Sequence, residues 1–110
     1  MSKRKVVEFL TRGMSPFGKW FARLDAHAAA KVTAALYRME QGNFSNVKSV
    51  GKGVSEYRVD FGPGYRIYFG EEGDELVILL GGGAKKRQDQ DIKMAQILWA
   101  EYKAEKRRRE

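Results

Sequence analysis

The sequence contains no cysteine and a single histidine in 110 residues. Without cysteine the chain forms no disulfides and no thiolate metal sites, which fits a reducing compartment. The histidine, His27, lies among alanines. One histidine without cysteine argues against a transition-metal site and against a Cys–His nucleophile pair. We therefore expect neither a metal nor another cofactor, and we expect His27 to be structural or simply exposed.

Long hydrophobic runs are also missing. No stretch approaches the ~20 apolar residues that a membrane span requires. The basic start of the chain, Met1–Lys5, is not followed by the long apolar segment of a secretory signal. We therefore expect a cytoplasmic protein that does not associate with membranes.

Positive charge is abundant. The chain has 21 Lys and Arg residues against 14 Asp and Glu, a formal net charge of +7. A small domain this basic typically binds a polyanion such as RNA or DNA, an acidic partner or a membrane surface. The alternative is that the charge serves solubility alone. The length fits one domain, residues 1–110, with a modest core. We expect frayed basic ends at about 1–4 and 104–110.

The hydrophobic pattern predicts an α+β domain with element order β-α-α-β-β-β-α. The β-branched start of Val6–Leu10 predicts the first strand. Ser15-Pro16 and Asp25 are helix-start signals, and we expect the two helices to form a hairpin on one face of the sheet. Asn43–Lys52 is interpreted as a loop. An apolar stripe predicts a final helix over about 89–106.

Three strands follow within Gly53–Gln90, which gives a mainly antiparallel twisted sheet of about four strands. The first two alternate, and their polar residues share one face, which we expect to be exposed: Glu56, Arg58, Asp60, Arg66 and Tyr68. A regular hairpin at Gly62-Pro63-Gly64 would place Asp60 near Arg66 and Arg58 near Tyr68. The third, Leu76–Leu80, is apolar throughout, as expected of a strand covered on both faces.

A glycine-rich basic segment follows the last strand. We expect Gly81-Gly82-Gly83 to form a flexible loop that carries Lys85, Lys86 and Arg87 over the sheet edge. With Arg58, Arg66 and Tyr68, these cations would hold a phosphate and stack a base. The alternative is an ordinary solvated face with Asp60–Arg66 and Glu56–Arg58 contacts. The residues alone leave both interpretations open.

The segments VSEYRVDFGPGYRIYFGEEGDELV and ELVILLGGGAKKRQDQDIKMAQILW resemble addiction-module killer proteins, the HigB-like branch of the RelE/ParE toxin superfamily. QGNFSNVKSVGKGVSEYRVDFGPGYRIYF adds to the likeness, which runs from about Val6 to Tyr102. The resemblance implies the small RelE/ParE-like fold. It also implies a toxin held inactive by a cognate antitoxin, commonly a helix-turn-helix protein of the same operon, so that DNA is involved only through the antitoxin.

Within this superfamily, RelE-like members cut mRNA on the ribosome without a metal. The resemblance places Arg66 at the scissile phosphate and Lys85 and Lys86 beside it as catalytic residues. It also matches Arg58 to a basic strand position. The RNA-binding residues we expect are Arg58 and, from the residues themselves, Tyr68, Arg87, Lys48 and Lys52. A proton-transferring lysine and tyrosine of RelE are replaced by Asp60 and Ile92, so Asp60, Tyr68, Lys86 or a ribosomal group must move the protons.

The leading hypothesis is therefore a ribosome-associated mRNA endoribonuclease that blocks translation. The replacement at Ile92 keeps two alternatives open. One is a ParE-like toxin that inhibits DNA gyrase without cutting nucleic acid. The other is a catalytically degenerate protein that only binds RNA or its antitoxin.

Overall fold

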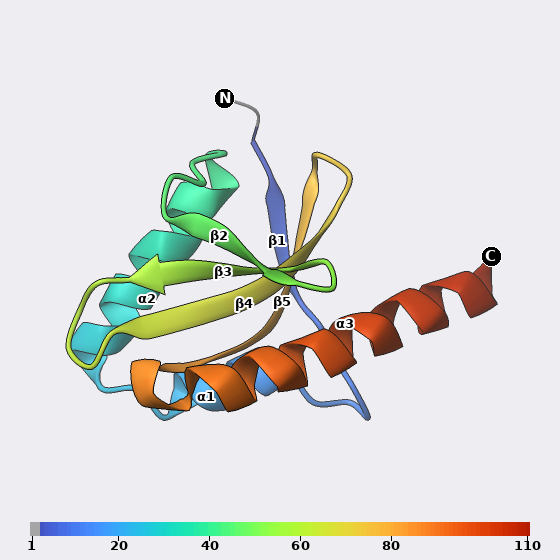
Figure 1. The fold of residues 1–110 in the computed structure, drawn as a ribbon. Coiled ribbons are helices and arrows are strands. Elements are labelled where there is room, and N and C mark those ends of the chain that lie inside the picture. The colour runs from blue at the N-terminus through green and yellow to red at the C-terminus, as the bar shows by residue number, and fades with distance from the viewer. Residues whose placement is uncertain (1–2) are drawn as a thin grey trace.

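A computed structural model describes residues 3–110 and shows a five-stranded mixed sheet with helices on both faces (Figure 1). Strand order is β1-β5-β4-β3-β2, with β1 parallel to β5 and every other pair antiparallel. The α+β class is confirmed. The elements are β1 Lys5–Glu8, α1 Pro16–Ala22, α2 Ala26–Glu40, β2 Val47–Gly51, β3 Val54–Val59, β4 Tyr65–Glu72, β5 Leu76–Ala84, a 3-10 turn Lys85–Arg87 and α3 Gln88–Arg109.

The helical hairpin α1–α2 packs on one face of the sheet, as predicted. Ser15 Oγ accepts a hydrogen bond from the Gly18 amide at 2.8 Å, and Asp25 Oδ1 accepts one from the Ala28 amide at 2.9 Å. These caps satisfy amides that have no partner in the first turn of a helix. The buried side chains of the hairpin meet the apolar side chains of β3, β4 and β5 in one core cluster: Phe17, Val32, Ala35 and Met39 from the helices.

Strand β2 was missed by the sequence prediction, which assigned Asn43–Lys52 to a loop. Four of its five residues pair with β3, with an irregularity at Val50, and the strand forms the edge of the sheet. The turn that follows bends sharply, because Gly51, Lys52 and Gly53 all have positive φ angles. Two glycines make that conformation inexpensive. The Gly51-Lys52-Gly53 turn was the available signal for a hairpin.

Strand β5 is longer than predicted, and its glycines do not form a flexible loop. Gly81, Gly82 and Gly83 pair with β4 as ordinary strand residues. The coverage of this strand on both faces is confirmed, because Val77 and Leu79 lie in the core under α1–α2, whereas Ile78 and Leu80 lie in a second core under α3. The glycines are needed for close packing: a Cβ at Gly82 would collide with the Trp20 ring and one at Gly83 with the Asp91 carboxylate.

We expect Gly82→Ala to lower the free energy of unfolding by about 1–3 kcal/mol, because the added methyl group overpacks the contact with Trp20. Gly81→Ala is the matched control, since a Cβ there meets nothing within 4 Å and φ is not positive. Urea unfolding of both variants measures the difference. Equal stability of the two would contradict the packing reason for glycine at position 82.

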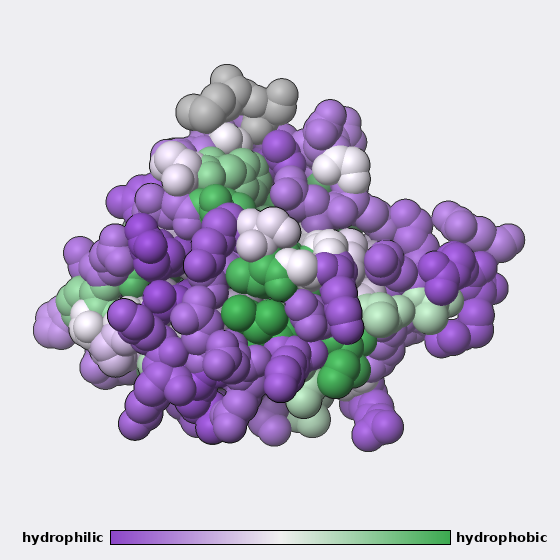
Figure 2. Space-filling model, viewed as in Figure 1, coloured by the Kyte–Doolittle hydropathy of each residue, from purple (hydrophilic) through white to green (hydrophobic). Residues whose placement is uncertain are grey.

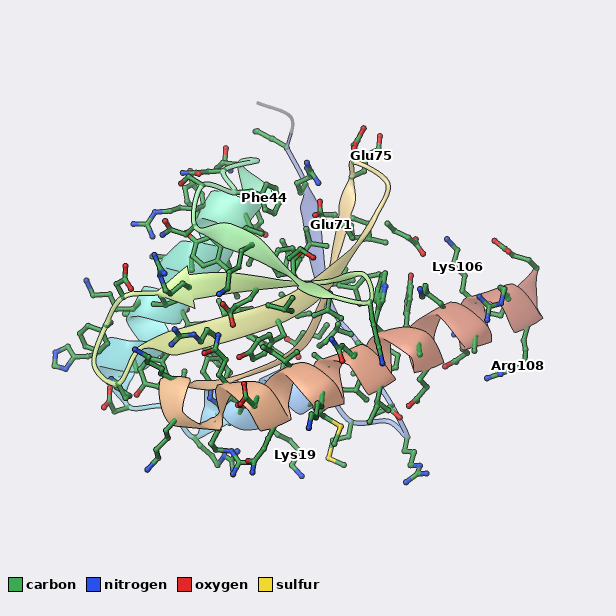
Figure 3. The ribbon with its side chains drawn as sticks, in the orientation of Figure 1. Lys19, Phe44, Glu71, Glu75, Lys106 and Arg108 are labelled. Atoms are coloured by element: carbon green, nitrogen blue, oxygen red, sulfur yellow. The ribbon has the colours of Figure 1, made fainter. Side chains whose placement is uncertain are left out.

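The final helix begins at Gln88 and continues to Arg109, three residues past the predicted end. Its last turns carry Lys106 and Arg108 beyond the sheet (Figure 3). The Tyr102 hydroxyl and Lys106 Nζ donate to Glu72 Oε2 at 2.7 and 2.6 Å and tie the helix to β4. The fraying predicted for residues 1–4 and 104–110 stays a prediction, and residues 1–2 lie outside the described range. No helix in residues 3–110 is long and apolar enough to cross a membrane.

Candidate nucleic-acid interface

The polar residues of β2, β3 and β4 lie on the sheet face that α3 covers in part. In one cross-strand row Lys48, Glu56 and Tyr68 are direct neighbours, and in the next row Arg58 lies opposite Arg66. This register is shifted by two residues from the predicted one, so Arg66 lies opposite Arg58 and not opposite Asp60. We call these five residues the polar face: Lys48, Glu56, Arg58, Arg66 and Tyr68.

Glu56 is the centre of the polar face and is nearly fully buried, with its side chain 2% exposed. Gln88, at the start of α3, donates to Glu56 Oε1 at 2.7 Å. Arg66 Nε lies 3.7 Å from the same oxygen, and Lys48 Nζ lies 3.9 Å from Oε2. A buried carboxylate needs such partners, because leaving a charge unpaired in the interior is costly. The sequence prediction placed Glu56 on an exposed face and gave it no role.

Arg66 is also buried, which corrects the expectation that it is exposed. Arg66 is only 7% exposed, and its Nη1 donates a hydrogen bond to the Gly64 carbonyl at 2.8 Å. The predicted Asp60–Arg66 and Glu56–Arg58 contacts are replaced by Arg66–Glu56 and Arg58–Asp60 ion pairs. The physical reason is the register. Arg66 lies opposite Arg58, two residues from Glu56 on the same face, and its guanidinium reaches Glu56 instead of Asp60.

Tyr68 is fully buried, so its ring does not offer the exposed stacking plane that was predicted. Its hydroxyl has no hydrogen-bond partner among residues 3–110. Burial raises the pKa of Tyr68 far above its usual range, and the negative charge of Glu56 raises the pKa further. The buried hydroxyl of Tyr68 is therefore a poorer candidate than Glu56 for taking a proton from a bound ligand.

A small hollow opens where α3 does not cover the polar face. It has a volume of about 130 Å³ and is lined by Ser45, Asn46, Val47, Lys48, Glu56 and Arg58. We call it the Glu56 pocket. It presents a buried carboxylate between two cations that are largely exposed, Lys48 and Arg58. Cations at a rim bind phosphate oxygens, and a carboxylate at the base accepts a proton or a hydrogen bond.

Asp60 lies outside this pocket, at the exposed end of β3. Its side chain is 76% exposed, and Oδ1 is 3.4 Å from Arg58 Nε. It therefore screens the charge of Arg58 rather than that of Arg66. Its position makes Asp60 a poorer candidate than Glu56 for proton transfer at the pocket.

The cations after β5 are exposed, but they lie on a 3-10 turn and not on a flexible loop. Lys85 comes close to Arg66 through the β3–β4 turn: a Cβ at Gly64 would lie 3.1 Å from Arg66 Nη1 and 3.7 Å from the Lys85 Cβ. Arg87 Nε is 3.9 Å from Asp91 Oδ1. Burial raises the pKa of Asp91, while the Arg87 charge lowers it. Lys86 is exposed on the same turn.

Three further predicted positions lie apart from this cluster. Lys52 is at the tip of the β2–β3 hairpin, where it lines a separate hollow with Lys93 and Ile97 of α3. Ile92 packs into the core under α3. His27 is exposed at the start of α2, which agrees with the prediction of a structural or exposed histidine.

Residues 19–104 match the family described as phage derived protein Gp49-like (DUF891). An uncharacterized protein of Haemophilus influenzae (strain Rd) is 46% identical over 83 residues, which cover 74% of this chain and 84% of the relative. No solved structure gives a significant match. The chain therefore belongs to the Gp49-like family of phage-derived proteins, a family associated with toxin–antitoxin systems.

Proposed function

We propose that this protein is the toxin of a HigB-like toxin–antitoxin pair, and that it blocks translation by cutting mRNA at the Glu56 pocket. The observation that carries the proposal is the buried Glu56 carboxylate, which lies between Lys48 and Arg58 and is paired with Arg66. A base that is flanked by phosphate-binding cations is the arrangement that RNA cleavage through the 2′-hydroxyl requires. The family association supports the toxin assignment.

The chemistry follows from these positions. Lys48 and Arg58 hold the scissile phosphate at the rim, and Glu56 takes the proton of the 2′-hydroxyl as its oxygen attacks phosphorus. The bond from phosphorus to the 5′-oxygen breaks, and that oxygen takes a proton from a general acid outside the pocket lining, for which we propose the ammonium group of Lys85 or Lys86 on the turn after β5. The products are a 2′,3′-cyclic phosphate and a 5′-hydroxyl, so the step needs no metal ion.

Arg66 contributes in two ways in this proposal. Its guanidinium is the buried counter-charge of the Glu56 carboxylate, with Arg66 Nε 3.7 Å from Glu56 Oε1. Once Glu56 is protonated, the guanidinium loses its counter-charge and stabilises the negative charge that gathers on the phosphorane oxygens. Arg87 and Lys52 hold RNA farther from the pocket. Tyr68 supports Glu56 from inside the sheet rather than stacking on a base.

The proposed partners are mRNA in the ribosome and a cognate antitoxin, a helix-turn-helix protein of the same operon that supplies any DNA contact. A cytoplasmic location follows from these partners. A reconstituted translation reaction tests the nuclease assignment. With the protein added, we expect truncated mRNA in the presence of ribosomes, whereas intact mRNA during a complete block of translation would contradict cleavage.

Gyrase inhibition remains the second candidate because of Ile92. This aliphatic side chain packs into the core under α3 and supplies no proton at the position where the resemblance expects a tyrosine. Supercoiling by purified gyrase in the presence of the protein separates the two functions. Inhibition of supercoiling with intact mRNA would favour the gyrase inhibitor, and inactivity in both assays would favour a protein that only binds RNA or its antitoxin.

We expect Asp60→Asn to strengthen RNA binding by about two- to fivefold, since the substitution frees Arg58 from an exposed ion pair. Cleavage should be retained, because Asp60 lies outside the pocket. Fluorescence anisotropy with an uncleavable 2′-O-methyl RNA measures the affinity, and Asp74→Asn, in the distant β4–β5 turn, is the control for the loss of one negative charge. A loss of cleavage in Asp60→Asn would make Asp60 the proton-transfer group.

A further inference from the structure

The sheet is open at the end where β3 runs past the start of β2. Val47, opposite Tyr57, is the first β2 residue in register with β3. Just before it, the Asn46 carbonyl still accepts a hydrogen bond from the Arg58 amide at 3.2 Å, whereas Val59 has no β2 partner in the ladder. Figure 1 shows this end of β3 crossing in front of α2. The surface around it is mainly hydrophilic in Figure 2.

A groove of about 310 Å³ lies between α2 and this end of β3, and its polar lining comes from Lys31 and Arg38 of α2 together with Asn46, Arg58 and Asp60. We call it the edge groove. Asn46 and Arg58 also line the Glu56 pocket, so the two hollows meet at these residues. Lys31 and Arg38 are both exposed, and Lys31 Nζ lies 5.6 Å from the centre of the Phe61 ring.

We propose that the edge groove binds the backbone of the RNA strand that leaves the Glu56 pocket, with Lys31 and Arg38 each contacting a phosphate. This inference rests on the proposed nuclease function. A single strand is held by a cationic groove that follows its backbone. The groove supplies three cations against one carboxylate, Asp60, which is already paired with Arg58. Its continuity with the pocket favours RNA over an acidic protein segment.

The test compares two uncleavable, fully 2′-O-methylated single-stranded RNAs, of about 4 and about 12 nucleotides, both within the range of lengths that single-strand grooves bind. The groove variant is Lys31→Gln/Arg38→Gln. The control variant, Lys5→Gln/Lys19→Gln, removes the same charge from β1, at the opposite edge of the sheet, and from α1. All four side chains are exposed, so both variants should unfold in urea as the wild type does.

We expect the groove variant to lose affinity for the longer RNA and to bind the shorter RNA as the wild type does. For the longer RNA, the slope of log K against log salt concentration should become shallower by about 1.4, or about 0.7 for each of the two lost phosphate contacts. The control variant should keep the wild-type slope.

Equal slopes for the two variants, with RNA still bound, would overturn the proposed role of the edge groove and leave the nuclease proposal standing. Loss of poly-glutamate binding in the groove variant, with both RNAs bound normally, would assign the groove to an acidic protein segment instead. Failure of the wild type to bind either RNA would overturn both proposals.

Discussion

Glu56→Gln is expected to reduce the rate of mRNA cleavage by about 10²–10⁴-fold, the usual contribution of a positioned general base. The substitution keeps the shape of the side chain and an acceptor for the Gln88 amide, which donates to Glu56 Oε1 at 2.7 Å. It removes the ability to take the proton of the 2′-hydroxyl. Affinity for an uncleavable RNA should fall little, because Lys48 and Arg58 remain at the rim of the pocket.

Single-turnover cleavage of a ribosome-bound message measures this effect most directly. The rate must be corrected for the folded fraction, because removing the charge of Glu56 leaves Arg66 buried without its counter-ion. Asp60→Asn is the matched control, since it removes a carboxylate directly after the same strand but outside the pocket. Wild-type cleavage by folded Glu56→Gln would remove Glu56 from the mechanism.

Arg66→Ala is expected to lower the free energy of unfolding by about 3–5 kcal/mol, the cost of breaking a buried ion pair from one side. Glu56 would lose its most buried cationic partner, and the remaining ion pair with Lys48 is longer, at 3.9 Å, and largely exposed. The sequence analysis placed Arg66 on an exposed face, and an exposed Arg66 could be replaced by alanine without a loss of stability. Urea unfolding, followed by circular dichroism, measures the change.

A double variant separates the ion pair from simple loss of packing. Glu56→Gln/Arg66→Met replaces both charges by neutral side chains of similar length, and we expect it to be more stable than Arg66→Ala because no buried charge is left unpaired. It should not cleave RNA. If Arg66→Ala is as stable as the wild type, the ion pair of Arg66 with Glu56 contributes nothing to the stability of the fold.

The pattern of apolar residues was sufficient to predict most of the fold. Alternation in β3 and β4, the continuous apolar run of β5 and the caps at Ser15 and Asp25 are local signals, and the structure contains the elements they predict. The edge strand β2 was missed because only two of its residues are apolar and its turn contains a lysine with positive φ. The three glycines of β5 indicated flexibility, whereas two of them make room for Trp20 and Asp91.

The site was harder to predict because it depends on what covers each face. The sequence correctly indicated that Glu56, Arg58, Arg66 and Tyr68 share one face of the sheet. It did not indicate that α3 closes over part of that face and buries Glu56, Arg66 and Tyr68 while leaving Arg58 open. The register of the hairpin also affects the ion pairs. It is shifted by two residues from the predicted register, and Arg66 pairs with Glu56 while Arg58 pairs with Asp60.

The central claim is that this protein cuts mRNA through the 2′-hydroxyl, and mapping RNA ends in growing cells tests it most directly. After brief induction without antitoxin, 5′ ends that can be ligated only after phosphorylation mark 5′-hydroxyl termini. We predict that such ends accumulate within mRNA coding regions in cells that express the wild type and not in cells that express Glu56→Gln. Growth arrest by the wild type without new 5′-hydroxyl ends would contradict the claim.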